Sequence, residues 1–432
     1  MKKRTLKGTR EATMMALVIV TAAHLIGPYA HADFVFSTIG DRTVSTDQSH
    51  TYTVFGDMIF DPENGPIPQA GTLNVINGGT LTTVELIAGY QGIGTLNVNG
   101  GTVNVTGDSF LGYLYDATAT VSSGSWATGG NLYIGSFDYD SPGELTITGS
   151  GFVSVSGNLA RTSSGVINLN NGGTLQIGNG GTTGTLLGGT GNLTNNGTLI
   201  FDRSNASSYS GVLSGSGALG KQGPGTLTLS GANNYGGSTT VSAGTLELSG
   251  DGALTDTSGV NIHGGTLLLT NVSDRINHAA GISLGAATGD SILRLSGNVT
   301  EALGAMTLAG ENADRRVIDF GAVSGSLSME NLTGNSSQGV EIWNWTDSTD
   351  HLYVKSGSLW GGLTTSNISF FSDGGVSLIG TAQFTSSNEP IIPGELVPVP
   401  EASTLLAVLG LIAPLAWRER RHWMRCREAR GN

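Results

Sequence analysis

A short motif repeats along the first half of the chain at an almost constant interval, and this repeat constrains the fold most. Apolar–polar–apolar triplets recur at steps of 23, 23 and 26 residues, as Leu73-Asn74-Val75, Leu96-Asn97-Val98, Ala119-Thr120-Val121 and Leu145-Thr146-Ile147. Such alternation is typical of strands with one buried face. Glycine-rich turns separate the strands, and glycine supplies the positive φ that tight corners need. Because one turn of this size cannot bury its own apolar face, the period predicts a solenoid whose turns stack.

The predicted fold class is all-β, a parallel β-helix (solenoid) with a C-terminal β cap. Glycine accounts for 68 of the 432 residues. Inside helices each of these glycines would cost about 0.5–1 kcal/mol, which excludes a helical protein. An antiparallel sandwich with regular strand spacing is the alternative. The near-constant step of 23 residues favours the β-helix, because the loops of a sandwich vary in length.

The repeat changes in the middle of the chain. From about residue 165 to residue 269, the triplet Gly-Thr-Leu begins successive strands, starting at Gly173, Gly197, Gly225, Gly244 and Gly265. After Leu269 this pattern fades and aromatic residues become more frequent. Because the last turn of a solenoid must cover exposed strand edges, we expect a distinct C-terminal cap there.

Both ends of the chain have the composition of targeting segments. A basic stretch through Arg10 and an apolar run over 12–26 precede Ala30 and Ala32, the small residues that a signal peptidase reads. We therefore expect cleavage after Ala32, with an uncleaved membrane anchor as the alternative. Near the other end, the apolar stretch 405–417 would form a helix of about 20 Å, shorter than a membrane core. The alternative is an uncleaved C-terminal anchor.

The formal charge of −13 conceals an uneven distribution. Eleven of the 20 basic residues lie in the two end segments, so nine basic and 30 acidic residues remain between Asp33 and Trp417, a formal charge of −21. Such a body repels phosphate backbones, and we expect no binding to nucleic acid. The single cysteine, Cys426, lies in the basic tail, which excludes a disulfide framework and a cysteine-ligated metal site in the body.

Three stretches of the chain resemble known bacterial families. The C-terminal segment resembles the sorting tail of PEP-CTERM proteins, because an apolar stretch and several arginines follow the motif Val399, Pro400 and Glu401. That resemblance implies processing by an exosortase at the motif containing Pro400 and Glu401, and transient contact with the inner membrane. The sequence of residues 223–248 resembles the autotransporter-associated β-strand repeat, and residues 71–161 are similar to a related repeat. Both repeats imply a passenger-like parallel β-helix.

These observations divide the chain into six predicted segments. They are a signal peptide (1–32), an N-terminal cap (33–66), a solenoid of repeats of about 23 residues (67–164), a solenoid of autotransporter-associated repeats (165–300), a C-terminal cap and linker (301–395), and a sorting signal with a short hydrophobic helix and an arginine-rich tail (396–432).

No catalytic, cofactor-binding or metal site is predicted. The glycines at 215, 217 and 220 followed by Lys221 fit part of a phosphate-binding loop, but Gln222 replaces the required hydroxyl and no helix pattern follows. Three acidic groups carry oxygen ligands of the kind that Ca²⁺ prefers, but we expect them and the isolated histidines to be solvated or locally hydrogen-bonded. They are Asp57 with Asp61 and Glu63, Asp138 with Asp140, Asp347 with Asp350 and His351, and the separate His263 and His278. Tryptophan and tyrosine side chains could stack on sugars, although packing in the cap and in ladders is favoured.

The sequence therefore predicts a secreted structural and adhesive protein of the bacterial cell surface or extracellular matrix, built as a rigid rod. The expected partners are signal peptidase, an exosortase-like enzyme and extracellular polysaccharide. A polysaccharide lyase or hydrolase on the same scaffold is the alternative function, because some β-helix enzymes use carboxylates, Ca²⁺ and a basic residue.

Overall fold

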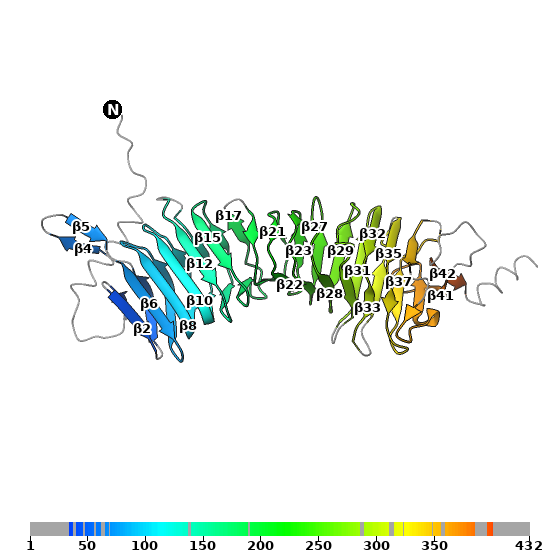
Figure 1. Ribbon diagram of the computed structural model, residues 1–432, viewed down its shortest axis with the longest axis horizontal. Helices are drawn as coiled ribbons and strands as arrows, with labels where there is room; N and C mark the ends of the chain where they lie inside the picture. The colour runs from blue at the N-terminus through cyan, green and yellow to red at the C-terminus, as the bar shows by residue number, and fades with distance from the viewer. Residues whose placement is uncertain are drawn as a thin grey trace, which may run out of the picture.

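A computed structural model describes the chain from residue 34 to residue 400, with gaps. The described backbone comprises residues 34–37, 40–45, 48–55, 58–61, 65–68, 70–136, 140–188, 191–285, 289–310, 315–322, 324–347, 349–355, 359–384 and 395–400. Within these residues the chain forms a parallel β-solenoid of stacked turns. Figure 1 shows the turns stacked side by side along the longest axis, so that the molecule is a rod with its blue N-terminal strands at one end.

Each turn has three sides, and a strand pairs in parallel with the equivalent strand of the next turn. Side 1 contains β2 (Gly40–Val44), β6 (Gly71–Ile76), the first halves of β8 (Gly94–Val105) and β10 (Ala117–Thr128), β12 (Gly143–Ile147), β15 (Gly165–Leu169), β18 (Leu193–Thr194), β21 (Leu213–Ser214), β24 (Ala232–Asn233), β27 (Ala253–Leu254), β32 (Val299–Leu303), β35 (Gly325–Met329) and β38 (His351–Val354).

Sides 2 and 3 follow in the same order along each turn. Side 2 contains the first halves of β3 (Gln48–Phe55) and β7 (Thr80–Ala88), the second halves of β8 and β10, β13 (Phe152–Val155), β16 (Thr174–Ile177), β19 (Thr198–Asp202), β22 (Ala218–Gln222), β25 (Thr239–Val241), β28 (Gly259–Ile262), β30 (Gly281–Leu284), β33 (Met306–Leu308), β36 (Leu332–Thr333) and β39 (Leu359–Trp360). Side 3 contains β1 (Phe34–Ser37), the second halves of β3 and β7, β9 (Ser109–Leu111), β11 (Leu132–Ile134), β14 (Leu159–Arg161), β17 (Leu186–Gly188), β20 (Ser207–Tyr209), β23 (Thr226–Leu229), β26 (Thr245–Leu248), β29 (Thr266–Thr270), β31 (Ser291–Ser296), β34 (Arg316–Asp319), β37 (Val340–Trp343) and β40 (Ile368–Phe371).

The hydrophobic core runs through the middle of the rod as ladders of equivalent side chains. Leu73, Leu96, Ala119 and Leu145 occupy one register position on side 1, and each is at most 3 % exposed. These are the first residues of the triplets in the sequence. Burying apolar surface contributes about 25 cal/mol of free energy per Å². Because every side of a turn buries such surface against the next turn, the stacked turns stabilise one another.

Glycine is required where the chain bends from side 1 to side 2. Gly100 and Gly124 both have a φ of +81°, and a Cβ on Gly124 would collide with the carbonyl oxygen of Gly101 in the preceding turn. A side chain at this corner would strain the backbone and separate the turns. The glycine content thus follows from the stacking of corners.

The two ends of the rod depart from parallel stacking. A hairpin of β4 (Met58–Asp61) and β5 (Gly65–Pro68) is inserted near the N-terminal end. Parallel pairing continues through β40, which then pairs antiparallel with β41 (Leu378–Phe384). The last described strand, β42 (Leu396–Pro400), pairs antiparallel with β41. A single 3-10 turn, η1 (Thr365–Asn367), precedes β40.

The parallel pairing confirms the predicted β-helix, and the alternative of an antiparallel sandwich is wrong. The signal peptide with Ala30 and Ala32, the apolar stretch 405–417 and Glu401 lie outside the described residues. In the part of the chain that the structure describes, no helix is long and apolar enough to cross a membrane.

Candidate functional site

The outward side chains of side 1 form a regular polar array near the N-terminal end of the rod. Residues alternate inward and outward along a strand, so the apolar members of each triplet are buried and the middle residue lies on the surface. The parallel register then aligns these surface residues from turn to turn. We call this array the outer polar face; it consists of Thr72, Asn74, Thr95, Asn97, Thr118, Thr120, Glu144, Thr146 and Asn168.

Hydrogen bonds along the rod fix several side chains of this face. The Asn97 amide Nδ2 donates to Asn74 Oδ1 at 2.9 Å. Three turns beyond Asn97, Asn168 Nδ2 donates to Glu144 Oε1 at 2.6 Å and to Thr146 Oγ1 at 3.2 Å, both in the preceding turn. An asparagine amide has two donor hydrogens and an acceptor oxygen, so each ladder bond leaves further hydrogen-bonding capacity on the surface. The array is therefore ordered without being saturated.

The charge around the outer polar face is negative. Residues 43–160 contain ten acidic residues and no lysine or arginine. Glu144 is the one carboxylate among the members of the face. Because like charges repel through the field of the whole surface, an anionic ligand approaches this part of the rod at a disadvantage.

Aromatic side chains form a second ladder on the outside of side 3. The rings of Phe110 and Tyr133 are stacked at 4.9 Å between centroids, and Tyr90 stacks with Tyr113 at 5.9 Å. Tyr113 also meets the edge of Phe110 at 5.4 Å. The stacked rings turn their faces toward one another along the rod, so this arrangement fits the predicted packing in ladders better than a platform for sugar rings.

The phosphate-loop match of the sequence ends inside a strand. Lys221 belongs to β22, points into the rod and is 1 % exposed. Its Nζ donates to the carbonyl oxygens of Gln222, Gly223 and Ala243. Burial lowers the pKa of Lys221 to about 8, although Asp202 opposes the shift. The amine closes a corner of the solenoid rather than facing a ligand.

The structure gives separate partners to Asp350 and His351, which the sequence places together. Asp350 is buried and accepts hydrogen bonds from the backbone N–H groups of Gly325 and Thr346. His351 Nδ1 lies 2.7 Å from Glu395 Oε1, a partner 44 residues away that sequence reasoning missed. No local spacing could have found this pair, because β42 and the end of side 1 meet only in the closed fold.

Of the remaining acidic groups, the structure describes only Asp140 with its side chain. Asp140 is exposed, with a φ of +56°, while Asp138 and the side chains of Asp57, Asp61 and Glu63 lie outside the described residues. In the described part of the chain, no three His, Cys, Asp or Glu side chains are close enough to hold a metal ion together.

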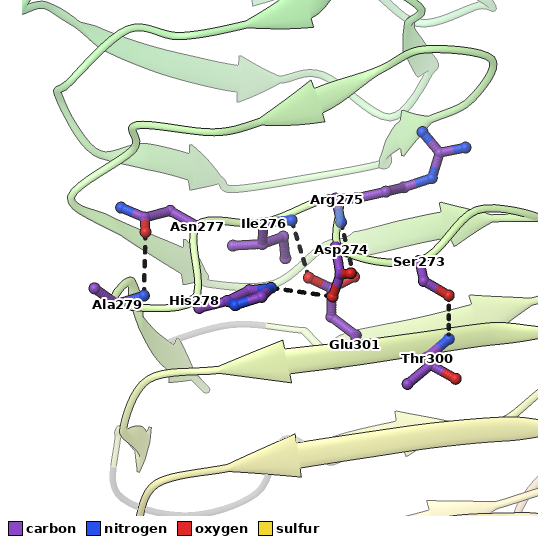
Figure 2. A network of polar contacts seen from close by, with 9 residues as sticks. All are labelled: Ser273, Asp274, Arg275, Ile276, Asn277, His278, Ala279, Thr300 and Glu301. Carbon is purple, nitrogen blue, oxygen red and sulfur yellow. Dashed lines mark hydrogen bonds and ion pairs between the residues drawn. The ribbon is translucent and has the colours of Figure 1, made fainter.

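One buried polar network lies inside the rod, between the turns of β29 and β32 (Figure 2). The Glu301 carboxylate is fully buried and accepts hydrogen bonds from the backbone N–H groups of Arg275 and Ile276, both at 2.9 Å. The Arg275 guanidinium points away from Glu301 and donates to backbone carbonyl oxygens. His278 lies outside this pair, 3.0 Å from Asp274. Burial raises the pKa of Glu301 to about 7, against the opposing effect of its two N–H donors.

The position of this network indicates a structural role. Side 1 continues here through a single bridge between Leu254 and Ile276, so the strand is interrupted and backbone N–H groups need other acceptors. The carboxylate oxygens of Glu301, in the next turn, are these acceptors. The other predicted histidine, His263, contacts Ser283 Oγ at 3.4 Å.

The predicted processing residues are only partly described. The backbones of Val399 and Pro400 belong to β42 and pair with Thr381 and Gly380. Ala30, Ala32 and Glu401 lie outside the described residues.

A family of known proteins matches part of the second repeat region, which the sequence places at about 165–269. The family described as Passenger-associated-transport-repeat matches residues 219–248, which run from β22 to the end of β26. The chain is also similar to the Adhesin BmaC autotransporter of Brucella suis biovar 1 (strain 1330), with 31% identity over 214 residues. This match covers 49% of the chain and 6% of the adhesin, so the chain spans a small part of that relative's length. No solved structure matches the chain.

Proposed function

We propose that this chain is a structural and adhesive protein of the bacterial cell surface or extracellular matrix, whose β-solenoid body contacts extracellular polysaccharide. One observation carries the proposal: a passenger-associated repeat, matched at 219–248, continues on both sides into a single rod. The similarity to a protein named as an autotransporter adhesin supports the same reading. A rigid rod displays one set of surface groups repeatedly, which multiplies weak contacts.

The export route is part of this proposal. The N-terminal segment would be removed by signal peptidase after Ala32, and the motif at Pro400 and Glu401 would be read by an exosortase-like enzyme. Mass spectrometry of the mature protein tests both steps. Loss of residues 1–32 and of the arginine-rich tail is expected, and a mature chain that retains residues 418–432 contradicts exosortase-type processing.

Attachment of the producing cells tests the adhesive function. Cells that lack the gene are expected to lose most of their retention on a surface coated with their own extracellular polysaccharide, and the intact gene should restore it. A gene truncated after Pro400 serves as the control, because its product keeps every described strand but should appear in the medium. Unchanged retention in the deletion strain would contradict adhesion.

A polysaccharide lyase or hydrolase on the same scaffold remains the alternative function. The name of the matched relative refers to adhesion, which favours the adhesive reading. Release of oligosaccharides from acidic or neutral glycans by the purified protein, measured with and without Ca²⁺, would establish the enzyme instead.

A further inference from the structure

We propose that the outer polar face binds an uncharged polysaccharide, which lies along the axis of the rod. The inference rests on the proposed adhesive function and deepens it by naming the surface and the ligand class. Its residues come from five consecutive strands of side 1, from β6 to β15.

The first argument is repetition. Neighbouring strands lie about 4.8 Å apart and outward residues of one strand about 6.6 Å apart, so the face offers a two-dimensional array of similar groups. Thr72, Thr95 and Thr118 occupy one row along the rod, and Asn74 and Asn97 begin the next. A ligand built from one repeating unit can use every turn in the same way, and its contacts then reinforce one another.

The second argument is the chemistry of the groups. Amides and hydroxyls donate and accept hydrogen bonds, as do the hydroxyls of a sugar. The ladder bond between Asn97 and Asn74, 2.9 Å long, holds two of these amides in place before a ligand arrives. Binding therefore costs less side-chain entropy than it would for free side chains.

The third argument is charge, which selects among polysaccharides. Residues 43–160 carry ten carboxylates and no lysine or arginine. The outer polar face itself contains no lysine or arginine, so a polyuronate or sulfated glycan would meet repulsion there, whereas an uncharged chain meets none.

The face does not have the composition of a protein-binding surface. Protein interfaces depend on a few large anchors, chiefly tryptophan, tyrosine and arginine, and the outer polar face contains none of them. The exposed apolar neighbours of the face on these strands are Val166 on β15, 45% exposed, and Ile76 on β6, 38% exposed. Small polar groups in rows fit a thin, hydroxylated chain better than a folded partner.

A paired substitution tests the location of the site. Asn97 and Thr120 are register partners on β8 and β10, and Asn97→Asp with Thr120→Glu replaces two donors by two acceptor-only carboxylates. Asn261 and Thr240 are register partners on β28 and β25, also outward and half-buried. Asn261→Asp with Thr240→Glu is therefore a matched control with the same charge change in the same geometry.

The experiment measures co-sedimentation of the exported full-length chain with insoluble cellulose, chitin and β-1,3-glucan, and its retention on immobilised alginate. We expect binding to at least one uncharged polysaccharide that is insensitive to salt, because screening affects only charged ligands. The Asn97/Thr120 variant should bind about tenfold more weakly, and the control should stay within about twofold of the wild type. Circular dichroism of both variants verifies that the β-structure is intact.

Three results would overturn the proposal: binding to alginate alone, binding to none of the polysaccharides, or equal weakening by the two variants. Each of these leaves the adhesive function standing if the gene deletion still abolishes cell attachment. The converse outcome is a deletion strain that attaches normally while glycan binding by the purified protein still depends on the outer polar face. That result would contradict the proposed cellular function and support the proposed binding site.

Discussion

At the scale of single residues, buried polar side chains repair the places where the solenoid interrupts its strands. Asn233 accepts a hydrogen bond from the N–H of Leu213 and donates to the carbonyl oxygen of Gly231. Lys221 donates to three carbonyl oxygens, and Glu301 accepts from two N–H groups. An unpaired buried backbone group costs about 1–3 kcal/mol, so these side chains allow short strands and sharp corners to coexist.

The raised pKa of Glu301 predicts a specific dependence of stability on pH. Burial raises this pKa from 4.5 to about 7, while Arg275 and Ile276 oppose the shift through their N–H groups, Asp274 adds to it and His278 opposes it. Between these values the unfolded chain ionises first, so the folded state binds more protons and stability falls as the pH rises. The loss attributable to Glu301 is about 3 kcal/mol between roughly pH 4.5 and pH 7.

Urea unfolding of the wild type and of Glu301→Gln at several pH values measures this effect. The glutamine cannot ionise, so the variant should lack that part of the pH slope. Glu330→Gln is the control, because Glu330 is an exposed partner of Lys355, and it should keep the wild-type slope. Equal slopes in the wild type and Glu301→Gln would show that Glu301 stays ionised in the fold, held by its two N–H donors.

At the scale of elements, the sequence predicts strands well and their partners less well. The triplet that contains Leu73 and Val75 predicts β6, its buried residues and its parallel partner one period later. The 12-residue strands β8 and β10 are not evident, because glycines at 100 and 124 resemble turns but bend a continuous strand. The contact between His351 and Glu395 could not be predicted, since it depends on how the last strands close the rod.

The candidate site illustrates the same limit. Asn74 and Asn97 stand in the middle of the triplets that revealed the fold, where an outward residue suggests only solvent exposure. A single strand gives no reason to regard such a residue as functional. The array exists because the parallel register aligns these positions in successive turns, and register is a property of the stacked molecule.

The two prolines of the last described strand predict that rods do not associate end to end. Pro398 and Pro400 alternate along β42, which pairs with β41, and Glu395 just before β42 forms one bridge with Tyr353 of β38. Proline has no N–H and occurs on edge strands with that side toward solvent, so the open edge lacks donors for another strand. We expect Pro398→Thr with Pro400→Thr to restore two donors and to cause concentration-dependent association, measured by sedimentation velocity.

Val397→Thr with Val399→Thr is the matched control for this edge. It places two threonines in the same strand without adding an N–H group, and it should remain monomeric. A proline variant that stays monomeric and becomes more stable would place the new N–H groups against β41 and contradict protection of the edge.

At the scale of the whole molecule, the rod is nearly one-dimensional: each turn contacts the turns before and after it. Its stability is then a sum of turn and interface terms, and no single turn is indispensable. The same geometry explains why the chain can carry two repeat types in one body. Both present three strands per turn with an inward ladder, so β15 to β19 join them without a break in parallel pairing on side 2.

Removal of one complete turn provides the sharpest test of this architecture. Gly71 pairs with Gly94, and Gly94 pairs with Ala117. Deletion of residues 94–116 therefore joins Ile93 to Ala117, which occupies in its own turn the position that Gly94 occupies in the deleted one. The shortened chain should keep its β-sheet circular dichroism and become about 4.8 Å shorter in small-angle scattering. Its binding to an uncharged polysaccharide should weaken, because the outer polar face loses Thr95 and Asn97.

Deletion of residues 94–105 removes fewer residues but breaks the order of the three sides, and this chain should aggregate. If the shorter deletion folds as well as the complete one, register between turns does not determine the fold.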